Sequence, residues 1–313
     1  MDCRPPDKRQ NVSGMSSQGQ RPGQWQVSGS APEVYELELV PAIFAPWAPL
    51  VVDLGRPRQG DRVLDLACGT GIVARTAAQR VGPAGAVVGV DLNPGMLKVA
   101  RSLRPAGRHC GAPVEWQEAS ADKLPFPNAS FDVAYCQLGL QFFADRAAAL
   151  REIHRVLVAD GRLALMVWCG LDESPGFAVL ADMLGRHVGP AAAAIMRAPF
   201  GLSNFDELAD LVGDAEFCDV AIQKRVGTVR FPSIEKLVLS YAIGSPLAGL
   251  VSQADPAARE ALVDDVRQAL GEYTSATNVT FPIAAHLLSA RASDDRAARL
   301  SQALPLDTPR RDT

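Results

Sequence analysis

The sequence predicts an α/β protein built on a doubly wound, mostly parallel sheet. Short apolar segments alternate with amphipathic helical segments from residue 59 to about 170, and a glycine turn joins the first apolar segment directly to a helix. Strands and helices that alternate in this way form βαβ units, in which neighbouring strands run parallel. With 313 residues, of which 48% are hydrophobic, the chain can bury a sizeable core without disulfides or metal.

Five strands and three helices are predicted in this region. The strands are apolar runs at 62–66, 86–90, 114–118, 131–136 and 162–168. The helices lie between them at 71–80, 94–103 and 146–158. The second helix starts with Pro94, a residue favoured at the first helical position, and the third aligns Leu150, Ile153 and Leu157 on one stripe. Asp160–Gly161 is expected to end the third helix.

The pattern differs on both sides of this region. Before it, an apolar periodic stretch from Pro32 to Leu54 predicts one or two short helices, interrupted at Pro41 and Pro46. After it, Ser203 with Asp206 three residues later forms a capping-box pattern that predicts the start of a helix. Strands are expected at 217–226 and 279–292, with helices at 233–243 and 256–273 between them. This long excursion predicts a helical lid inserted at the edge of the sheet.

Composition and pattern divide the chain into five parts. The first 30 residues are rich in Gln, Ser, Gly, Pro and Arg and nearly lack aliphatic side chains, so we expect a disordered tail at 1–30. The other expected parts are an N-terminal helical cap at 31–58, a ligand-binding core at 59–170, a C-terminal part at 171–300 that completes the sheet and carries the lid at about 230–275, and a tail at 301–313.

Charge and cysteine content disfavour several classes of protein. The formal net charge of −4 does not suit an extended phosphate-binding surface, so no nucleic-acid partner is expected. The six cysteines are scattered without a close pair, which indicates neither a metal site nor a disulfide framework. The sequence shows no signal peptide and no apolar stretch long enough for a membrane span. We therefore expect a cytoplasmic protein that works as a monomer or a homodimer.

The most informative segment runs from Val63 to Ala74, where a strand meets a glycine turn and then a helix. Gly69 and Gly71 let the backbone approach a ligand that a Cβ would exclude, and the first N–H groups of the helix face the same crevice. Their spacing to Ala74 also fits a dinucleotide site. The two ligands that fit this geometry are a dinucleotide and S-adenosylmethionine. Asp65 favours S-adenosylmethionine, because its carboxylate would repel a pyrophosphate and attract the ammonium and sulfonium groups of S-adenosylmethionine.

Two further acidic residues follow strands and suit the same ligand. Asp91 ends the second strand about twenty residues after the turn, where a carboxylate can accept both ribose hydroxyls. The alternative for Asp91 is a helix N-cap before Pro94. Ala121 and Asp122 follow the third strand, where an acidic side chain can accept from the adenine amino group; the alternative for Asp122 is a solvated loop residue.

Four ordered motifs lie within residues 60–170. They read Asp-Leu-Ala-Cys-Gly-Thr-Gly, Gly-Val-Asp-Leu-Asn-Pro-Gly-Met-Leu, Ala-Asp-Lys-Leu-Pro-Phe-Pro-Asn-Ala-Ser-Phe-Asp-Val-Ala, and Leu-Arg-Glu-Ile-His-Arg-Val-Leu before Asp-Gly-Arg-Leu. Together they resemble the class I methyltransferases, and among these the ubiquinone/menaquinone-type and small-molecule methyltransferase-domain enzymes. The resemblance implies a seven-stranded Rossmann-like sheet whose last strand, at Val279–Ala292, is antiparallel.

The same resemblance implies the residues of a cofactor site. The methionine part is expected near Asp65, Ala67, Gly69 and Gly71, the ribose on Asp91, the adenine near Leu92, Met96, Ala121 and Asp122, and the methyl group beside Cys136 and Gln137. Tyr35 is expected either to close over the cofactor or to anchor its own helix.

No clear general base is evident from the sequence. The candidates for a catalytic residue are Gln137, His286 and Tyr35, while Phe142 and Phe143 can wall an acceptor pocket or belong to the core. After the fourth strand the chain lacks the Asn/Asp-Pro-Pro-aromatic motif of enzymes that methylate nucleobase or glutamine amides. That departure disfavours such substrates.

These observations together predict methyl transfer from S-adenosylmethionine to a small, hydrophobic metabolite, with S-adenosylhomocysteine as product. The accepting atom can be oxygen, carbon or nitrogen. A methyl group on a sulfonium is already activated, so alignment of the two reactants is expected to supply most of the catalysis. Two alternatives are an NAD-type oxidoreductase and a non-catalytic regulator that binds the cofactor.

Overall fold

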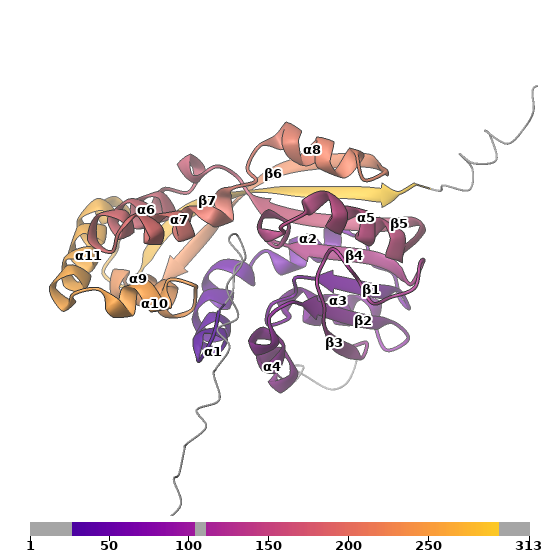
Figure 1. Cartoon of the computed structure of the whole chain (residues 1–313), viewed down its shortest axis with the longest axis horizontal. Coiled ribbons are helices and arrows are strands. Elements are labelled where there is room, and N and C mark those ends of the chain that lie inside the picture. The colour runs from indigo at the N-terminus through magenta and orange to yellow at the C-terminus, as the bar shows by residue number, and fades with distance from the viewer. Residues whose placement is uncertain (1–26, 104–110, 294–313) are drawn as a thin grey trace, which may run out of the picture.

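One seven-stranded sheet organises the part of the chain that this computed structural model describes, which comprises residues 27–103 and 111–293 (Figure 1). The strand order is β3-β2-β1-β4-β5-β7-β6. Strands β1 to β5 run parallel to one another, and β7 is antiparallel to both β5 and β6. The predicted fold class is therefore confirmed. The strands are β1 (Arg62–Leu66), β2 (Ala86–Asp91), β3 (Val114–Glu118), β4 (Phe131–Gln137), β5 (Leu157–Trp168), β6 (Phe217–Phe231) and β7 (Val279–Ala292).

Helices cover both faces of this sheet because side chains alternate across each strand. Val63 of β1 packs in one core cluster with α2 (Ala48–Leu54) and α3 (Ile72–Val81). The neighbouring Leu64 packs in the other cluster with α5 (Arg146–Val156) and α8 (Phe205–Gly213). Helix α4 (Pro94–Ser102) follows β2 and is capped by Asn93, whose side chain accepts the N–H groups of Gly95 and Met96. Strand order reverses between β1 and β4, which is where doubly wound sheets bind ligands.

The N-terminal helices differ from the prediction at Pro41. Helix α1 (Ala31–Val34) runs without a break into η1 (Tyr35–Phe44), a π-helix that holds Pro41 inside it. The expected interruption at Pro41 is therefore wrong, because the wider π-helical turn accommodates a ring that would collide with the preceding turn of an α-helix. The chain does break at Pro46, in the turn before α2.

Two further boundaries differ from the prediction. Helix α5 ends at Val156, and Asp160–Gly161 lie inside β5, where Asp160 takes a positive φ of 60° that a short polar residue tolerates. The cap of α8 is Asn204 and not Ser203: the Asn204 side chain accepts the N–H of Glu207 at 2.9 Å. The carbonyl of Ser203 instead accepts a hydrogen bond from His286.

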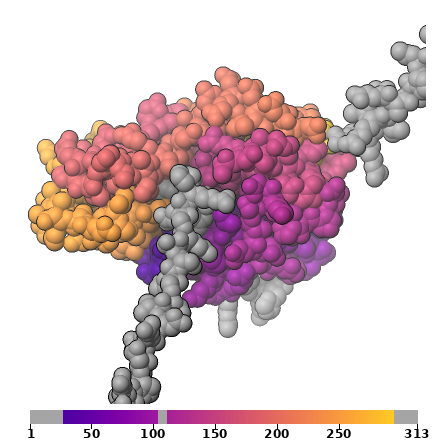
Figure 2. Space-filling view, in the orientation of Figure 1, coloured from indigo at the N-terminus to yellow at the C-terminus, as the bar shows by residue number. Residues whose placement is uncertain are grey.

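A helical lobe covers the far half of the long antiparallel pair β6 and β7 (Figures 1 and 2). The two helices expected between these strands are present. The second ends at Ala269, and a 3₁₀ turn at Gly271–Tyr273 follows where the helix was expected to continue. Three helices of the lobe were not predicted, although two of these start with proline at the first position. The lobe consists of α6 (Pro175–His187), α7 (Pro190–Arg197), α9 (Ile234–Ile243), α10 (Ala248–Gln253) and α11 (Pro256–Ala269).

The ends of the chain are only partly described. Residues 1–26 of the expected N-terminal tail and the whole of the expected tail at 301–313 lie outside the described residues. Val27, within the expected tail, is buried in a small cluster with Ala31 and Met96, so packing begins earlier than predicted. Among the described helices no single one is long and apolar enough to cross a membrane, and one bent pair, Ala31–Phe44 with Ala48–Leu54, meets that test by length and composition.

The glycine turn after β1 yields a prediction about stability. Gly71 has a φ of 87°, and a Cβ there would collide with the Trp116 ring of β3. Replacing Gly71 with Ala is expected to destabilise the protein by about 2–4 kcal/mol, from backbone strain and overpacking together. In a Trp116→Leu background the same change should cost only the backbone part, about 1–2 kcal/mol. Urea unfolding of the four proteins measures this, and an equal cost in both backgrounds would contradict it.

Candidate functional site

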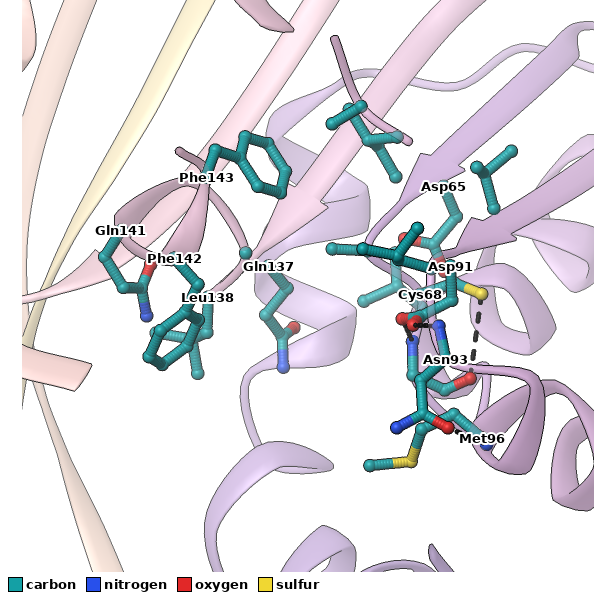
Figure 3. Close-up of a pocket in the computed structure, with 18 of the residues that line it drawn as sticks. Asp65, Cys68, Asp91, Asn93, Met96, Gln137, Leu138, Gln141, Phe142 and Phe143 are labelled. Atoms are coloured by element: carbon teal, nitrogen blue, oxygen red, sulfur yellow. Dashed lines mark hydrogen bonds between the residues drawn. The ribbon is translucent and has the colours of Figure 1, made fainter. Parts of the chain in front are cut away.

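A cavity opens at the C-terminal ends of β1, β2 and β4, beneath η1 (Figure 3). Its two halves have different chemistry. One half is lined by the carboxyl groups of Asp65, Asp91 and Asp122 around the glycine turn. The other is lined by aromatic and amide side chains that follow β4 and β5 and by Tyr241 from α9.

Gly69 and Gly71 have different roles in the turn. A Cβ on Gly69, whose φ is 55°, would have only the Tyr35 side chain within 4 Å, so this glycine exposes its backbone to the cavity. Gly71 is not among the lining residues, and its missing side chain makes room for Trp116. Ala67, which lines the cavity, also has a positive φ of 54°, an unusual conformation for a residue with a Cβ.

Asp65 is buried at the end of β1 and accepts the N–H of Ala74 at 2.8 Å. Ala74 is in the first turn of α3, whose N–H groups have no partner within the helix. The carboxyl group thereby ties the strand to the helix that follows the turn. Burial, together with the nearby Asp91 carboxylate, raises the pKa of Asp65 to about 8 against the opposing effect of the hydrogen bond from Ala74.

Asp91 joins the ends of two strands. One oxygen accepts the N–H of Gly69 at 2.8 Å, and the other accepts the N–H of Asn93 at 2.8 Å. Each carboxylate oxygen has two lone pairs, so both keep one for a further donor. Burial raises the pKa of Asp91, and these backbone hydrogen bonds oppose that shift. The N-cap of α4 is Asn93, so the alternative role of Asp91 as a helix cap is wrong.

Tyr35 of η1 lies over the glycine turn and stacks on Phe44, with ring centroids 5.0 Å apart. The next residue, Glu36, forms a half-buried ion pair with Arg75 of α3 at 3.0 Å. Arg75 also donates to the carbonyl of Thr70 in the turn. These contacts hold η1 against the turn. Burial raises the pKa of the Tyr35 hydroxyl above its ordinary value, which makes it a poor proton acceptor at neutral pH.

The chamber beyond the turn is mostly apolar. Its wall includes Leu138, Phe142 and Phe143, which follow β4, together with Trp168 at the end of β5 and Tyr241 of α9. We call these residues, together with Gln137 and Gln141, the acceptor chamber (Figure 3). Neither Lys, Arg nor His is among the described residues that line the whole cavity.

The structure brings most of the predicted site residues together, but not all. The cavity is lined by Tyr35, Asp65, Ala67, Gly69, Asp91, Leu92, Met96, Ala121, Asp122, Gln137, Phe142 and Phe143. Cys136 is buried in the core on one face of the sheet and does not line the cavity. His286 lies on β7, outside the lining, where its Nε2–H donates to the carbonyl of Ser203 at 2.9 Å and its ring packs against Phe205.

Sequence reasoning missed several lining residues. Asn93 could have been found, because an Asn before Pro94 at a strand's end is typical of a helix cap. Trp168 carried a weaker signal, as the last residue of a predicted strand whose carboxyl end faces the crevice. Gln141 and Tyr241 carried none, because their places depend on how the turn after β4 and the C-terminal lobe pack.

The cavity fits a ligand with cationic groups and hydroxyls better than one with a pyrophosphate. Carboxyl groups from three different strand ends line it, and no cationic side chain does among the described residues. The backbone N–H of Gly69, which a phosphate would require, is already donated to Asp91. This arrangement disfavours the dinucleotide that the glycine spacing alone allows.

Comparison with known proteins agrees with the site. Residues 64–165 match the model of a methyltransferase domain family. A ubiquinone/menaquinone biosynthesis C-methyltransferase of Xanthomonas campestris pv. campestris is 42% identical over 120 residues, which are 38% of this chain and 47% of that protein. The corresponding protein of Ectopseudomonas mendocina is 40% identical over 141 residues, 45% of this chain and 53% of that protein. The chain thus spans about half the length of the curated relatives that it matches.

Solved structures share the fold. A methyltransferase-like protein of Bacillus halodurans aligns with a TM-score of 0.54 at 19% identity, over 79% of this chain and 99% of that one. Phosphoethanolamine N-methyltransferase 2 of Haemonchus contortus, solved with S-adenosylhomocysteine, aligns with a TM-score of 0.51 at 19% identity, over 84% of this chain and 57% of that one. Residues 64–165 thus match a methyltransferase domain family, and the solved structures share the fold of the chain. The S-adenosylhomocysteine in the Haemonchus contortus structure is the product of the cofactor that the sequence predicted, and neither alternative gains support.

The buried Asp65 carboxyl yields a prediction about pH. Its pKa of about 8 in the fold exceeds its ordinary value of 3.8, so the folded protein holds this proton more tightly than the unfolded chain. The contribution of Asp65 to stability is therefore present below pH 4 and is lost as the pH rises to about 8. Asp65→Asn does not titrate, so the melting temperature of the variant should rise relative to wild type between pH 5 and pH 8.5.

Thermal unfolding of ligand-free protein at a series of pH values measures this difference. Asp210→Asn, an exposed residue of α8, serves as the control and should show no such trend. A difference between Asp65→Asn and wild type that stays constant with pH would contradict the raised pKa.

Proposed function

We propose that this protein transfers a methyl group from S-adenosylmethionine to a small, uncharged and largely apolar metabolite. The observation that supports this most is the continuity of the cavity, which runs from the glycine turn into the acceptor chamber without a cationic side chain among its described lining. Such a chamber suits an acceptor that brings no negative charge. We expect the reaction to take place in the cytoplasm.

We assign the cofactor-binding roles as follows. Asp91 would accept the ribose hydroxyls with the lone pairs that its two backbone hydrogen bonds leave available. Leu92, Met96 and Ala121 would enclose the adenine, with Asp122 accepting from its amino group. The methionine part would lie beside Asp65, Ala67 and Gly69, under Tyr35.

Catalysis would come mainly from alignment and from exclusion of water. The methyl group of the cofactor is already activated by the sulfonium, so the protein has to hold the acceptor in line with it, an effect worth about 7–11 kcal/mol in favourable cases. Tyr35 and Phe44 of η1 cover the turn from above, and the Glu36–Arg75 ion pair keeps η1 in place. Of the three candidate catalytic residues, Gln137 and Tyr35 line the cavity and His286 does not.

The ribose assignment predicts a strong effect of one substitution. Asp91→Ala removes the proposed partner of the ribose hydroxyls and also frees the N–H groups of Gly69 and Asn93, so it should weaken S-adenosylhomocysteine binding by about tenfold to a thousandfold. Asp91→Asn keeps the shape of the side chain and one acceptor oxygen, so its affinity for S-adenosylhomocysteine should lie between those of wild type and Asp91→Ala. Isothermal titration measures all three affinities.

Asp206→Ala, an exposed change in α8, is the control and should bind like wild type. Unchanged affinity of Asp91→Ala would remove the ribose assignment. If wild-type protein binds neither S-adenosylmethionine nor S-adenosylhomocysteine, the proposed function itself is lost.

A further inference from the structure

The acceptor chamber contains a buried amide that the fold does not use. Gln141 lies in η2 (Leu140–Phe142), the 3₁₀ turn after β4, and is only 7% exposed. Neither its Oε1 nor its Nε2 has a hydrogen-bond partner within residues 27–103 and 111–293. Buried polar groups in proteins are almost always paired, so both atoms of one side chain left unpaired in a cavity wall require an explanation.

The backbone around Gln141 is held firmly, so the unpaired amide does not reflect a loose turn. The guanidinium of Arg146 donates to the Gln141 carbonyl at 3.2 Å. The same guanidinium is paired with Glu207 of α8 at 3.1 Å. The main chain of the turn is thus fixed to α5 and α8, while its side chain lines the cavity.

A second amide in the chamber has a fixed orientation. Nε2 of Gln137 donates to the carbonyl of Phe44 at 3.1 Å, and its Oε1 is buried without a partner. Figure 3 shows Gln137 and Gln141 on the side of the cavity away from Asp65 and Asp91. The chamber therefore offers one amide NH₂ group and two amide oxygens, set among Leu138, Phe142 and the other apolar residues.

We propose that Gln141, with Gln137, selects acceptors by an uncharged group that presents a hydrogen-bond donor and a hydrogen-bond acceptor side by side. This inference rests on the proposed function and adds a specificity determinant to it. Oε1 and Nε2 of Gln141 lie in one plane, so their complement is a neutral group with the reverse pattern, as in a lactam, or a hydroxyl that donates and accepts at once.

The same geometry disfavours two other kinds of acceptor. An entirely apolar ring would leave the Gln141 amide buried and unpaired, and a site built to hydrogen-bond a substrate rejects analogues that lack the partner. A carboxylate or phosphate would enter a chamber without a cationic side chain among its described lining residues, beside carboxyl groups in the other half of the cavity.

A matched series of bicyclic aryl methyl ethers tests the proposal. The probes are 6-methoxy-2-quinolone, 6-methoxy-2-naphthol, 2-methoxynaphthalene and 6-methoxy-2-naphthoate, which share the methoxy end and differ at the other end only. Isothermal titration measures their binding to protein saturated with S-adenosylhomocysteine. At least one of the two neutral polar probes should bind about tenfold or more tightly than 2-methoxynaphthalene, and the carboxylate should bind more weakly than either. Which of the two binds more tightly distinguishes a lactam from a hydroxyl as the recognised group.

Three variants make the assignment specific to Gln141. Gln141→Leu should bring the affinity for the polar probe to within about twofold of that for 2-methoxynaphthalene, with S-adenosylhomocysteine affinity unchanged, because it removes only the amide. Gln141→Asn keeps an amide and should retain part of the preference. Gln268→Leu, an exposed change on α11, should retain all of it.

The outcomes separate this inference from the proposed function. If wild type binds S-adenosylhomocysteine but shows no preference for a polar probe, binds none of the four, or keeps its preference in Gln141→Leu, the role of Gln141 is overturned while the cofactor site stands. If wild type does not bind S-adenosylhomocysteine, the proposed function fails, and this inference fails with it.

Discussion

The candidate site depends on the Asp91 carboxylate, which holds the ends of β1 and β2 in one geometry. Its two oxygens accept the N–H groups of Gly69, in the turn after β1, and Asn93, before α4. The Asp65 carboxyl group likewise connects the end of β1 to the first turn of α3 by accepting the N–H of Ala74. Because these carboxyl groups satisfy backbone donors that a tight turn would otherwise leave unpaired, the turn can keep its left-handed residues and leave Gly69 open to the cavity.

The C-terminal lobe completes the other half of the cavity, whose remaining wall follows β4 and β5. Strands β6 and β7 continue well past the parallel core as a paired ribbon, and the helices around them bring Tyr241 to the cavity wall. Phe177 of α6 packs against Phe200, Tyr241 and Phe281, so an aromatic cluster supports the position of Tyr241 from behind. The half with the carboxyl groups thus lies at the strand ends of the doubly wound sheet, and the acceptor chamber combines residues that follow β4 and β5 with Tyr241 from the lobe.

The sequence predicted the strands and the residues at their ends, because these depend on local hydrophobic patterns. The strand predicted at Val279–Ala292 matches β7 at both ends. Asp65 and Asp91 lie at the ends of β1 and β2, and Gly69 follows β1, so the three converge at one edge of the sheet. Pro41 was misread because tertiary packing widened the helix around it. Gly71 was assigned to the ligand because its contact with Trp116, forty-five residues away, leaves no trace in the local sequence. Gln141 was not found for the same reason.

A crystal structure of the complex with S-adenosylhomocysteine tests the central claim most directly. The account predicts that both ribose hydroxyls lie within hydrogen-bond distance of the Asp91 carboxylate, that the adenine lies between Leu92 and Ala121, and that the sulfur faces Gln137 at the entrance of the acceptor chamber. Ligand density elsewhere on the molecule, or a ribose that does not contact Asp91, would contradict it.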